Sequence, residues 1–149
     1  MDTTDSAARR NGRMSWIPGA SSLGELLGLR QPLATRVGAL RNDAIAGTPG
    51  RVAALIDARV DQLLGGSGSL DSFAPLAAAE QAVVAVVEQF VLDAHGIDDA
   101  MMAELGRHYT APEQVSMLFH LAMADGFGKF TRTFGVESAA GPNAASGRA

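Results

Sequence analysis

Apolar residues recur every three or four positions through most of this chain, and no segment shows the strict alternation of a half-buried strand. This spacing predicts helices separated by glycine, proline or capping residues. We therefore expect a compact all-α domain of about six helices with no sheet. The expected helices are 22–29, 31–46, a third that follows Thr48, 75–95, a fifth that follows Asp98, and a long sixth from 111 to about 134.

Capping signals support the starts of several of these helices. Ser22 with Glu25, and Thr110 with Glu113, have the spacing of capping boxes. Asp98 is expected to cap the fifth helix. By the same argument Thr48 is expected to cap the third.

The sixth helix carries apolar residues on two sides. An almost unbroken stripe is expected to face the core, and its members are Val115, Leu118, Phe119, Ala122, Met123, Gly126, Phe127, Phe130 and Phe134. Met117 and Leu121 lie on the opposite side, where a surface helix usually carries polar residues. A helix that is apolar on both sides is either buried between layers or part of a subunit contact. We therefore expect Met117 and Leu121 to form an interface.

Composition narrows the class of protein. A chain of 149 residues, 47% apolar and 19% charged, fits one domain with its own core. Its net charge of −4 argues against nucleic-acid binding. The apolar runs are too short to cross a bilayer and no secretory signal is visible, so we expect no membrane contact and a cytoplasmic protein. We assign 1–20 to a flexible arm, 21–137 to the helical domain and 138–149 to a disordered tail.

The absence of cysteine removes several kinds of chemistry. It excludes thiolate nucleophiles, thiol redox chemistry and cysteine-based metal sites. The three histidines lack the spacing of metal ligands, so no metal is expected. The glycine-rich loop 65–68 lacks the lysine and the preceding strand of a phosphate-binding loop. No cofactor is expected.

Acid–base groups are the chemistry that remains, because imidazole and carboxylate side chains are the usual general acids and bases. The candidate catalytic residues are His95, His120 and Asp125, and the candidate pocket residues are Glu88, Met123 and Phe127. Structural roles stay open beside these. His95 suits the dipole at a helix end, His120 suits the border of the apolar stripe, and His108 suits a cap or the surface. Asp125 has the spacing of an ion pair with Lys129.

Three segments of the second half follow one another in an informative order. They are AEQAVVAVVEQFVLDAHGIDDAMMAEL (79–105), HYTAPEQVSMLFHLAMADGFGKF (108–130) and TFGV (133–136). A helix that opens with an acid leads into a short helix, a capped turn and a long closing helix. This order resembles the C-terminal half of the carboxymuconolactone decarboxylase / AhpD-like (alkylhydroperoxidase-like) family. The segment ALIDARVDQLLG (54–65) extends the resemblance towards the N-terminus.

The family's redox motif is not retained in this sequence. Its peroxidase-type members use G-C-x-x-C-x-x-x-H with an upstream glutamate. Placed on this chain, the motif keeps only Gly65. The cysteine positions fall on Gly66 and Ser69, the histidine position on Phe73 and the glutamate position near Ala54. We therefore expect no thiol peroxidase activity.

The resemblance implies an all-α fold, assembly into homotrimers or hexamers, and active sites near subunit contacts. We expect a family member without thiol redox chemistry that acts on or binds a small organic metabolite through acid–base groups. As an enzyme it would be a cofactor-independent lyase or isomerase, of decarboxylation, lactone or isomerisation type. Two alternatives stay open. One is a non-catalytic subunit that pairs with an intact, cysteine-containing relative, and the other is a homo-oligomeric binding or scaffold protein without chemistry.

Overall fold

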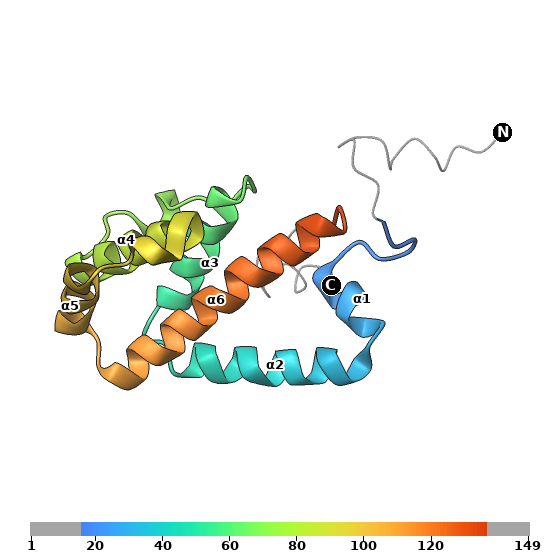
Figure 1. Cartoon of the computed structure of the whole chain (residues 1–149), viewed down its shortest axis with the longest axis horizontal. Helices are drawn as coiled ribbons and strands as arrows, with labels where there is room; N and C mark the ends of the chain where they lie inside the picture. The colour runs from blue at the N-terminus through green and yellow to red at the C-terminus, as the bar shows by residue number, and fades with distance from the viewer. Residues whose placement is uncertain (1–15, 137–149) are drawn as a thin grey trace.

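The computed structural model of this chain describes residues 16–136 (Figure 1). Within these residues it contains six α-helices, two 3-10 turns and no strand, which confirms the predicted all-α fold. The elements are α1 (Leu23–Gly28), α2 (Gln31–Ala46), α3 (Val52–Leu63), η1 (Asp71–Phe73), α4 (Ala78–Asp93), η2 (Ala94–Gly96), α5 (Asp99–His108) and α6 (Ala111–Thr133). Most of the predicted arm and the whole predicted tail lie outside the described residues.

Three of the predicted helix starts are confirmed. The hydroxyl of Ser22 accepts the backbone N–H of Glu25 at 3.1 Å in the first turn of α1. The carboxylate of Asp98 accepts a backbone N–H from the first turn of α5. At the start of α6, Thr110 and Glu113 each accept the other's backbone N–H, which makes a complete capping box.

The predicted cap of the third helix is wrong. Thr48 is buried, and its hydroxyl donates to the carbonyl oxygen of Ala44 at 2.8 Å, so it belongs to the end of α2. Gly50, with a left-handed φ of +56°, turns the chain before α3. The helix then begins at Val52, and the side chain of Arg51 does not cap it.

Helix α4 is shorter at both ends than predicted. It begins at Ala78, because the carboxylate of Glu80 accepts the backbone N–H of Ala77 at 3.0 Å. It ends at Asp93, whose carboxylate accepts the backbone N–H of His95 at 3.0 Å and turns the chain into η2. His95 therefore stands beyond the helix that the sequence expects to contain it.

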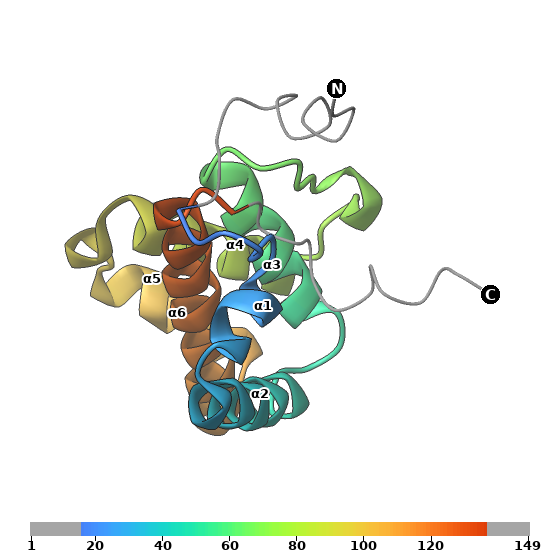
Figure 2. The same cartoon turned by 90° about the vertical axis from the view of Figure 1, so that its right-hand side faces the viewer.

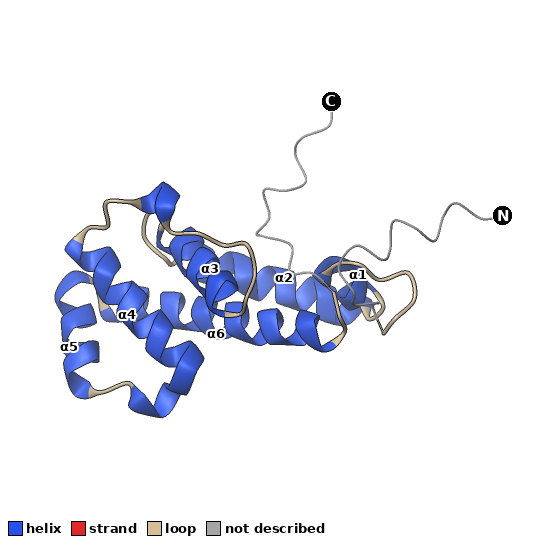
Figure 3. Cartoon of the chain, turned by 90° about the horizontal axis from the view of Figure 1, so that it is seen from above, coloured by secondary structure: helices blue, strands red, loops and turns tan. Residues whose placement is uncertain are grey.

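Helix α3 lies at the centre of the packing. It contacts α4 on one side and α6 on another, α5 packs against α4, and α2 runs beside α6. Figure 3 shows that α4 and α5 gather near one end of α6 whereas α1 lies near the other end. The long α6 thus joins two parts of the domain.

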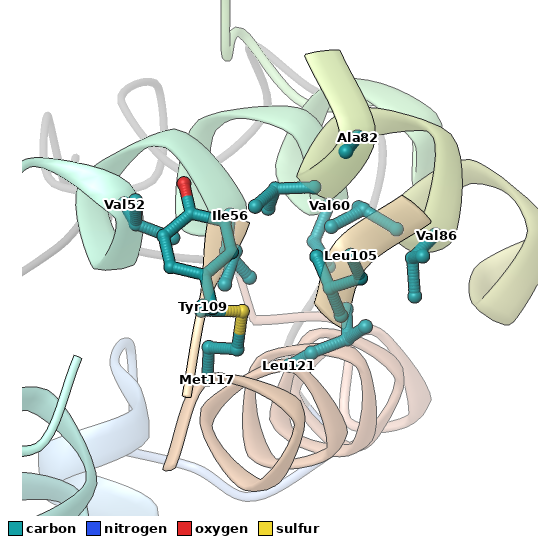
Figure 4. Close-up of a cluster of buried hydrophobic side chains, with 11 residues drawn as sticks. Val52, Ile56, Val60, Ala82, Val86, Leu105, Tyr109, Met117 and Leu121 are labelled. Atoms are coloured by element: carbon teal, nitrogen blue, oxygen red, sulfur yellow. The ribbon is translucent and has the colours of Figure 1, made fainter. Parts of the chain in front are cut away.

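The main hydrophobic core lies where α3, α4, α5 and α6 meet (Figure 4). Its buried members are Val52, Ile56, Val60, Ala82, Val83, Val86, Val87, Leu105, Tyr109, Met117 and Leu121. Burial of each large aliphatic side chain contributes about 1.5–3 kcal/mol to the free energy of unfolding. Burial of this cluster is therefore a major contribution to the free energy that stabilises the packing of the four helices.

The faces of α6 differ in part from the prediction. Met117 and Leu121 are each 1% exposed and belong to the chain's own core, so their predicted role as an interface is wrong. Part of the stripe expected inside is instead exposed, namely Val115, Phe119 and Phe130. The inward face is concealed in the sequence because it also holds polar and small residues, which are His120, Gly128 and Thr131.

The two ends of the described chain meet beside the C-terminal end of α6 (Figure 2). The backbone N–H of Trp16 donates to the carbonyl oxygen of Phe134 at 2.9 Å. Ala20, Leu26 and Val136 form a second, smaller buried cluster. Residues 16–20, which the sequence places in the arm, therefore pack against the helical domain.

Candidate functional site

Two carboxylates of α3 lie on the side that meets α6. Asp57 and Asp61 are four residues apart, so they share one face of the helix. Val60 and Leu64 lie beside them and supply apolar surface on the same side. Because α3 packs on α6, this face brings both carboxylates next to the side chains of α6.

His120 of α6 meets the first of these carboxylates. Its side chain is 1% exposed, and its Nε2 lies 2.9 Å from Oδ1 of Asp57. The other ring nitrogen, Nδ1, is buried and has no hydrogen-bond partner among the described residues. A buried polar atom without a partner costs about 1–3 kcal/mol. The arrangement therefore favours a ligand or a water molecule that supplies the missing hydrogen bond.

Arg41 of α2 extends this pair into a chain of three groups. Its Nη2 lies 3.5 Å from Oδ2 of Asp57, the carboxylate oxygen that His120 does not use. The side chains of Arg41 and Asp57 are partly exposed, at 29% and 25%, whereas His120 is enclosed. A cation, a carboxylate and an imidazole thus run from the surface to a buried ring nitrogen.

A second pair of charges lies one helical turn along α3. Oδ1 of Asp61 lies 3.5 Å from Nη2 of Arg132, and Oδ2 accepts the backbone N–H of Gly68 at 2.8 Å. A Cβ at Gly66 would collide with the Asp61 carboxylate. Gly66 is the position on which the first cysteine of the family motif falls. The loop therefore packs closely on Asp61, whose carboxylate would have to shift to admit a side chain at position 66.

These polar groups border a cavity of about 70 Å³ between α3 and α6. A single water needs roughly 10–15 Å³ of such volume, so the cavity has room for several waters or for part of a small organic molecule. Its lining consists of Leu23, Arg41, Asp57, Val60, Asp61, Leu64, His120, Met123, Ala124, Phe127, Gly128, Thr131 and Arg132. Charged and hydrogen-bonding side chains and apolar side chains both contribute to this lining.

The structure brings together half of the predicted site residues. His120, Met123 and Phe127 all line the cavity. His95 does not, since its side chain is 99% exposed on η2, where its Nδ1 lies 3.5 Å from Oδ1 of Asp93. Glu88 is also elsewhere, because its carboxylate pairs with Arg59.

Asp125 is partly buried, with its side chain 13% exposed, and lies outside the cavity lining. One carboxylate oxygen accepts a hydrogen bond from Lys129 Nζ at 2.7 Å, as the spacing predicts. The other oxygen, Oδ1, is buried without a hydrogen-bond partner among the described residues. Asp125 therefore does not meet His120 within one chain.

Four charged residues of the cavity were not identified from the sequence, namely Arg41, Asp57, Asp61 and Arg132. A signal was present for the two acids. They stand four residues apart on the side of the helix that also carries the apolar Val60 and Leu64, and an acid on an apolar helix face is out of place unless it has a partner. No local signal marks Arg41 or Arg132, because their roles depend on how α2 and α6 pack.

Residues 16–136 contain neither a candidate metal site nor a candidate membrane-spanning helix. No group of three or more histidine, aspartate or glutamate side chains is placed to hold a metal ion there. Nor does any helix in that range have the length and apolar character needed to cross a membrane.

Comparison with known proteins adds no assignment to this geometry. No family model, no curated protein and no solved structure matches the chain. The arrangement of Arg41, Asp57 and His120 beside the cavity therefore carries the functional argument, and the resemblance to the carboxymuconolactone decarboxylase family remains an expectation from the sequence alone.

Proposed function

We propose that this chain binds a small organic molecule in the cavity between α3 and α6 and moves a proton to or from it through His120. The observation that carries the proposal is the buried imidazole of His120. One of its ring nitrogens is held by Asp57 at 2.9 Å, and the other has no partner. A base in the lining of a cavity, with one ring nitrogen oriented by a carboxylate and the other without a partner, has the arrangement that proton transfer requires.

Each member of the chain of three groups has a separate role. With Asp57 ionised and the imidazole neutral, Nε2–H of His120 is the donor between them, so Nδ1 carries the lone pair. Asp57 also stabilises the imidazolium that forms when Nδ1 takes a proton. Arg41 balances the charge of Asp57 and keeps its carboxylate in place.

The cavity indicates the kind of molecule that fits. Among the lining residues, Leu64, Met123 and Phe127 offer apolar surface for a carbon skeleton. Arg41 has one ion pair, at 3.5 Å, and donates no shorter hydrogen bond to the described residues, so donors remain for an oxygen atom of a ligand. A small acid or lactone with an apolar body matches both the charged and the apolar side chains of the lining. This also agrees with the resemblance to carboxymuconolactone decarboxylases.

The reaction class that we propose is a decarboxylation, lactone opening or isomerisation without a cofactor. Thiol peroxidation is not part of it, because the chain has no cysteine. The alternative of a non-catalytic subunit loses the support that Met117 and Leu121 gave it, since both are buried in the chain's own core. The alternative of a binding protein without chemistry shares the same cavity, and experiment must separate the two.

Nuclear magnetic resonance of the three histidines is the first test. A panel of small carboxylic acids and lactones would be added while the imidazole Cε1–H signals of His95, His108 and His120 are followed. We expect a binder to shift the His120 signal and leave the other two in place. Asp57→Asn should then weaken binding about tenfold, because the ring of His120 loses its orientation.

Proton transfer is tested by exchange in deuterium oxide. The chain should catalyse incorporation of deuterium into the acidic C–H position of a ligand that binds, and His120→Gln should abolish it. His108→Gln is the matched control, because His108 also pairs with a carboxylate, that of Glu104 at 3.2 Å, but on the surface. Binding without exchange would leave a binding protein. Binding that is unchanged in both His120→Gln and Asp57→Asn would overturn the site.

A further inference from the structure

The outward face of α6 is an apolar stripe that the rest of the chain leaves uncovered. Val115 is 69% exposed, Phe119 44% and Phe130 37%, and Ala122 and Gly126 between them are also exposed. All five recur at the three- and four-residue spacing of one helix face. A contiguous apolar patch of this kind on a small domain marks an interaction surface.

The sequence of large and small side chains along the stripe is nearly the same whether it is read from the N-terminal or the C-terminal end of α6. Phe119 and Phe130 stand towards the two ends, and the small residues Ala122 and Gly126 stand at the middle. When two copies of one helix pack antiparallel about a two-fold axis, each position meets its mirror position. The two small pairs then meet at the crossing, and each Phe119 lies near the Phe130 of the other copy.

We propose that the occupant of this stripe is a second copy of this chain, docked α6 against α6 in antiparallel fashion. A two-fold interface uses the same patch on both subunits, so that patch must complement itself. The stripe meets this requirement. Ala122 and Gly126 let the two helices approach closely, and a Cβ built on Gly126 meets nothing within 4 Å, which leaves this position open to a partner.

The charges around the stripe fit the same partner. The stripe itself holds no charged residue. At its border, Lys129 and Asp125 pair with each other at 2.7 Å and together carry no net charge. Two-fold symmetry places the same border of both copies side by side, and this neutral border does not repel its copy.

The exposed area sets the strength of the association. With about 200 Å² for a whole phenylalanine, the three large side chains offer on the order of 300 Å² per copy. A stable interface of standard size buries roughly 800 Å² per partner. The dimer is therefore weak and reversible, and its population rises with concentration.

Sedimentation velocity over a wide range of concentrations tests the dimer. We expect the full chain to pass from monomer to dimer as the concentration rises, and Ala122→Arg to remain monomeric. Ala122 is exposed, so the substitution should leave the fold intact, which far-ultraviolet circular dichroism verifies. Leu92→Arg is the matched control, because Leu92 is a 75% exposed apolar residue on α4, outside the stripe.

Single cysteines test the orientation, since the natural chain contains none. In the antiparallel pair the two copies of position 126 are about 6 Å apart along the helix axis, and the two copies of position 119 about 15 Å apart. On oxidation, Gly126→Cys should therefore form disulfide dimers at least several-fold faster than Phe119→Cys. Gly38→Cys is the control, because Gly38 is also an exposed helical glycine whose added Cβ meets nothing within 4 Å.

Several results would overturn the proposal. They are a chain that stays monomeric at every concentration, an odd-numbered assembly, or a dimer that Ala122→Arg leaves unchanged. Cross-linking of Gly126→Cys no faster than that of Gly38→Cys would have the same force. Equal rates for Gly126→Cys and Phe119→Cys would exclude the antiparallel arrangement.

Discussion

Two charged clusters stand near the same helix, α3, and they are built differently. In the first, Arg51 Nε lies 2.6 Å and Nη2 3.0 Å from the two carboxylate oxygens of Glu80, and Nη2 also donates to the carbonyl oxygen of Phe73 at 2.8 Å. In the second, Arg41 approaches Asp57 only to 3.5 Å, and His120 beyond it keeps one nitrogen without a partner. We call the first cluster closed, because both carboxylate oxygens of Glu80 accept hydrogen bonds from Arg51, and the second open, because one buried nitrogen of His120 has no partner.

The difference separates a structural role from a functional one. Arg51 links the loop before α4 to the start of α3, both carboxylate oxygens of Glu80 are hydrogen-bonded, and neither side chain has a buried atom without a partner. The cluster of Arg41, Asp57 and His120 lies beside a cavity of about 70 Å³ and is incompletely bonded. Buried polar atoms with a purely structural role usually have a hydrogen-bond partner, because a buried polar atom without one destabilises the fold. The open cluster is the one expected to act on a ligand.

The largest effect is expected at His120, where shape and hydrogen bonding can be separated. His120→Ala should lower the free energy of unfolding by about 2 kcal/mol, because truncation of a buried side chain leaves a void. His120→Leu should lower it by less than about 1 kcal/mol, since leucine fills the space and Asp57 remains in contact with solvent. Urea denaturation followed by circular dichroism measures both changes.

An exposed histidine gives the reference for this pair of variants. His108→Ala should change the free energy of unfolding by a few tenths of a kcal/mol, as expected for a surface pair. If His120→Leu destabilised the chain as much as His120→Ala, the bond to Asp57 would be holding the fold together. The two clusters would then be alike, and the distinction between them would fail.

The second effect concerns the closed cluster and depends on pH. The Arg51 guanidinium, with a smaller contribution from the backbone N–H of Ala77, lowers the pKa of Glu80 to about 2. A lowered pKa stabilises the fold above the pKa of the unfolded chain, near 4.5, and this stabilisation is lost as the pH falls towards 2. Glu80→Gln should therefore be less stable than the natural chain at pH 7, with the difference vanishing near pH 2.

Removal of the partner checks the assignment of this pH dependence. In an Arg51→Gln background, Glu80→Gln should have a much smaller effect, because the ion pair is already absent. Urea midpoints of the four proteins at pH 7, 5, 4 and 3 give the comparison. An undiminished effect in that background would mean that Glu80 acts through its helix cap at Ala77 instead.

Local rules in the sequence account for much of the fold. Ser22, Asp98 and Thr110 were correctly identified as caps, since capping depends on a few neighbouring residues. Thr48 was misassigned because the same hydroxyl can accept from a following helix or donate to the preceding one. Which of these occurs depends on the turn at Gly50.

The faces of α6 show where sequence periodicity stops being informative. Both faces are apolar, so the periodicity alone does not say which one packs on α3. The face of α6 that packs on α3 is the one on which Gly128 fits beneath Leu64 and His120 bonds to Asp57. Both are contacts between distant parts of the chain. The candidate site was therefore found only in part. His120, Met123 and Phe127 were predicted, and the partners from α2 and α3 were not.

The smallest effect is expected where the closed cluster meets an aromatic ring. The guanidinium carbon of Arg51 lies 5.5 Å from the centre of the Phe73 ring, within the range of a cation–π contact. Phe73→Leu keeps an apolar side chain but removes the ring, so it should lower the free energy of unfolding by about 0.5 kcal/mol. The same substitution in the Arg51→Gln background should have almost no effect. Equal effects in both backgrounds would assign the contribution to apolar burial, leaving the Arg51 cluster closed by its hydrogen bonds alone. A loss confined to the chain that retains Arg51 would show that the Phe73 ring adds a cation–π contact to the hydrogen bonds of Arg51, whereas Arg41 has only its ion pair with Asp57.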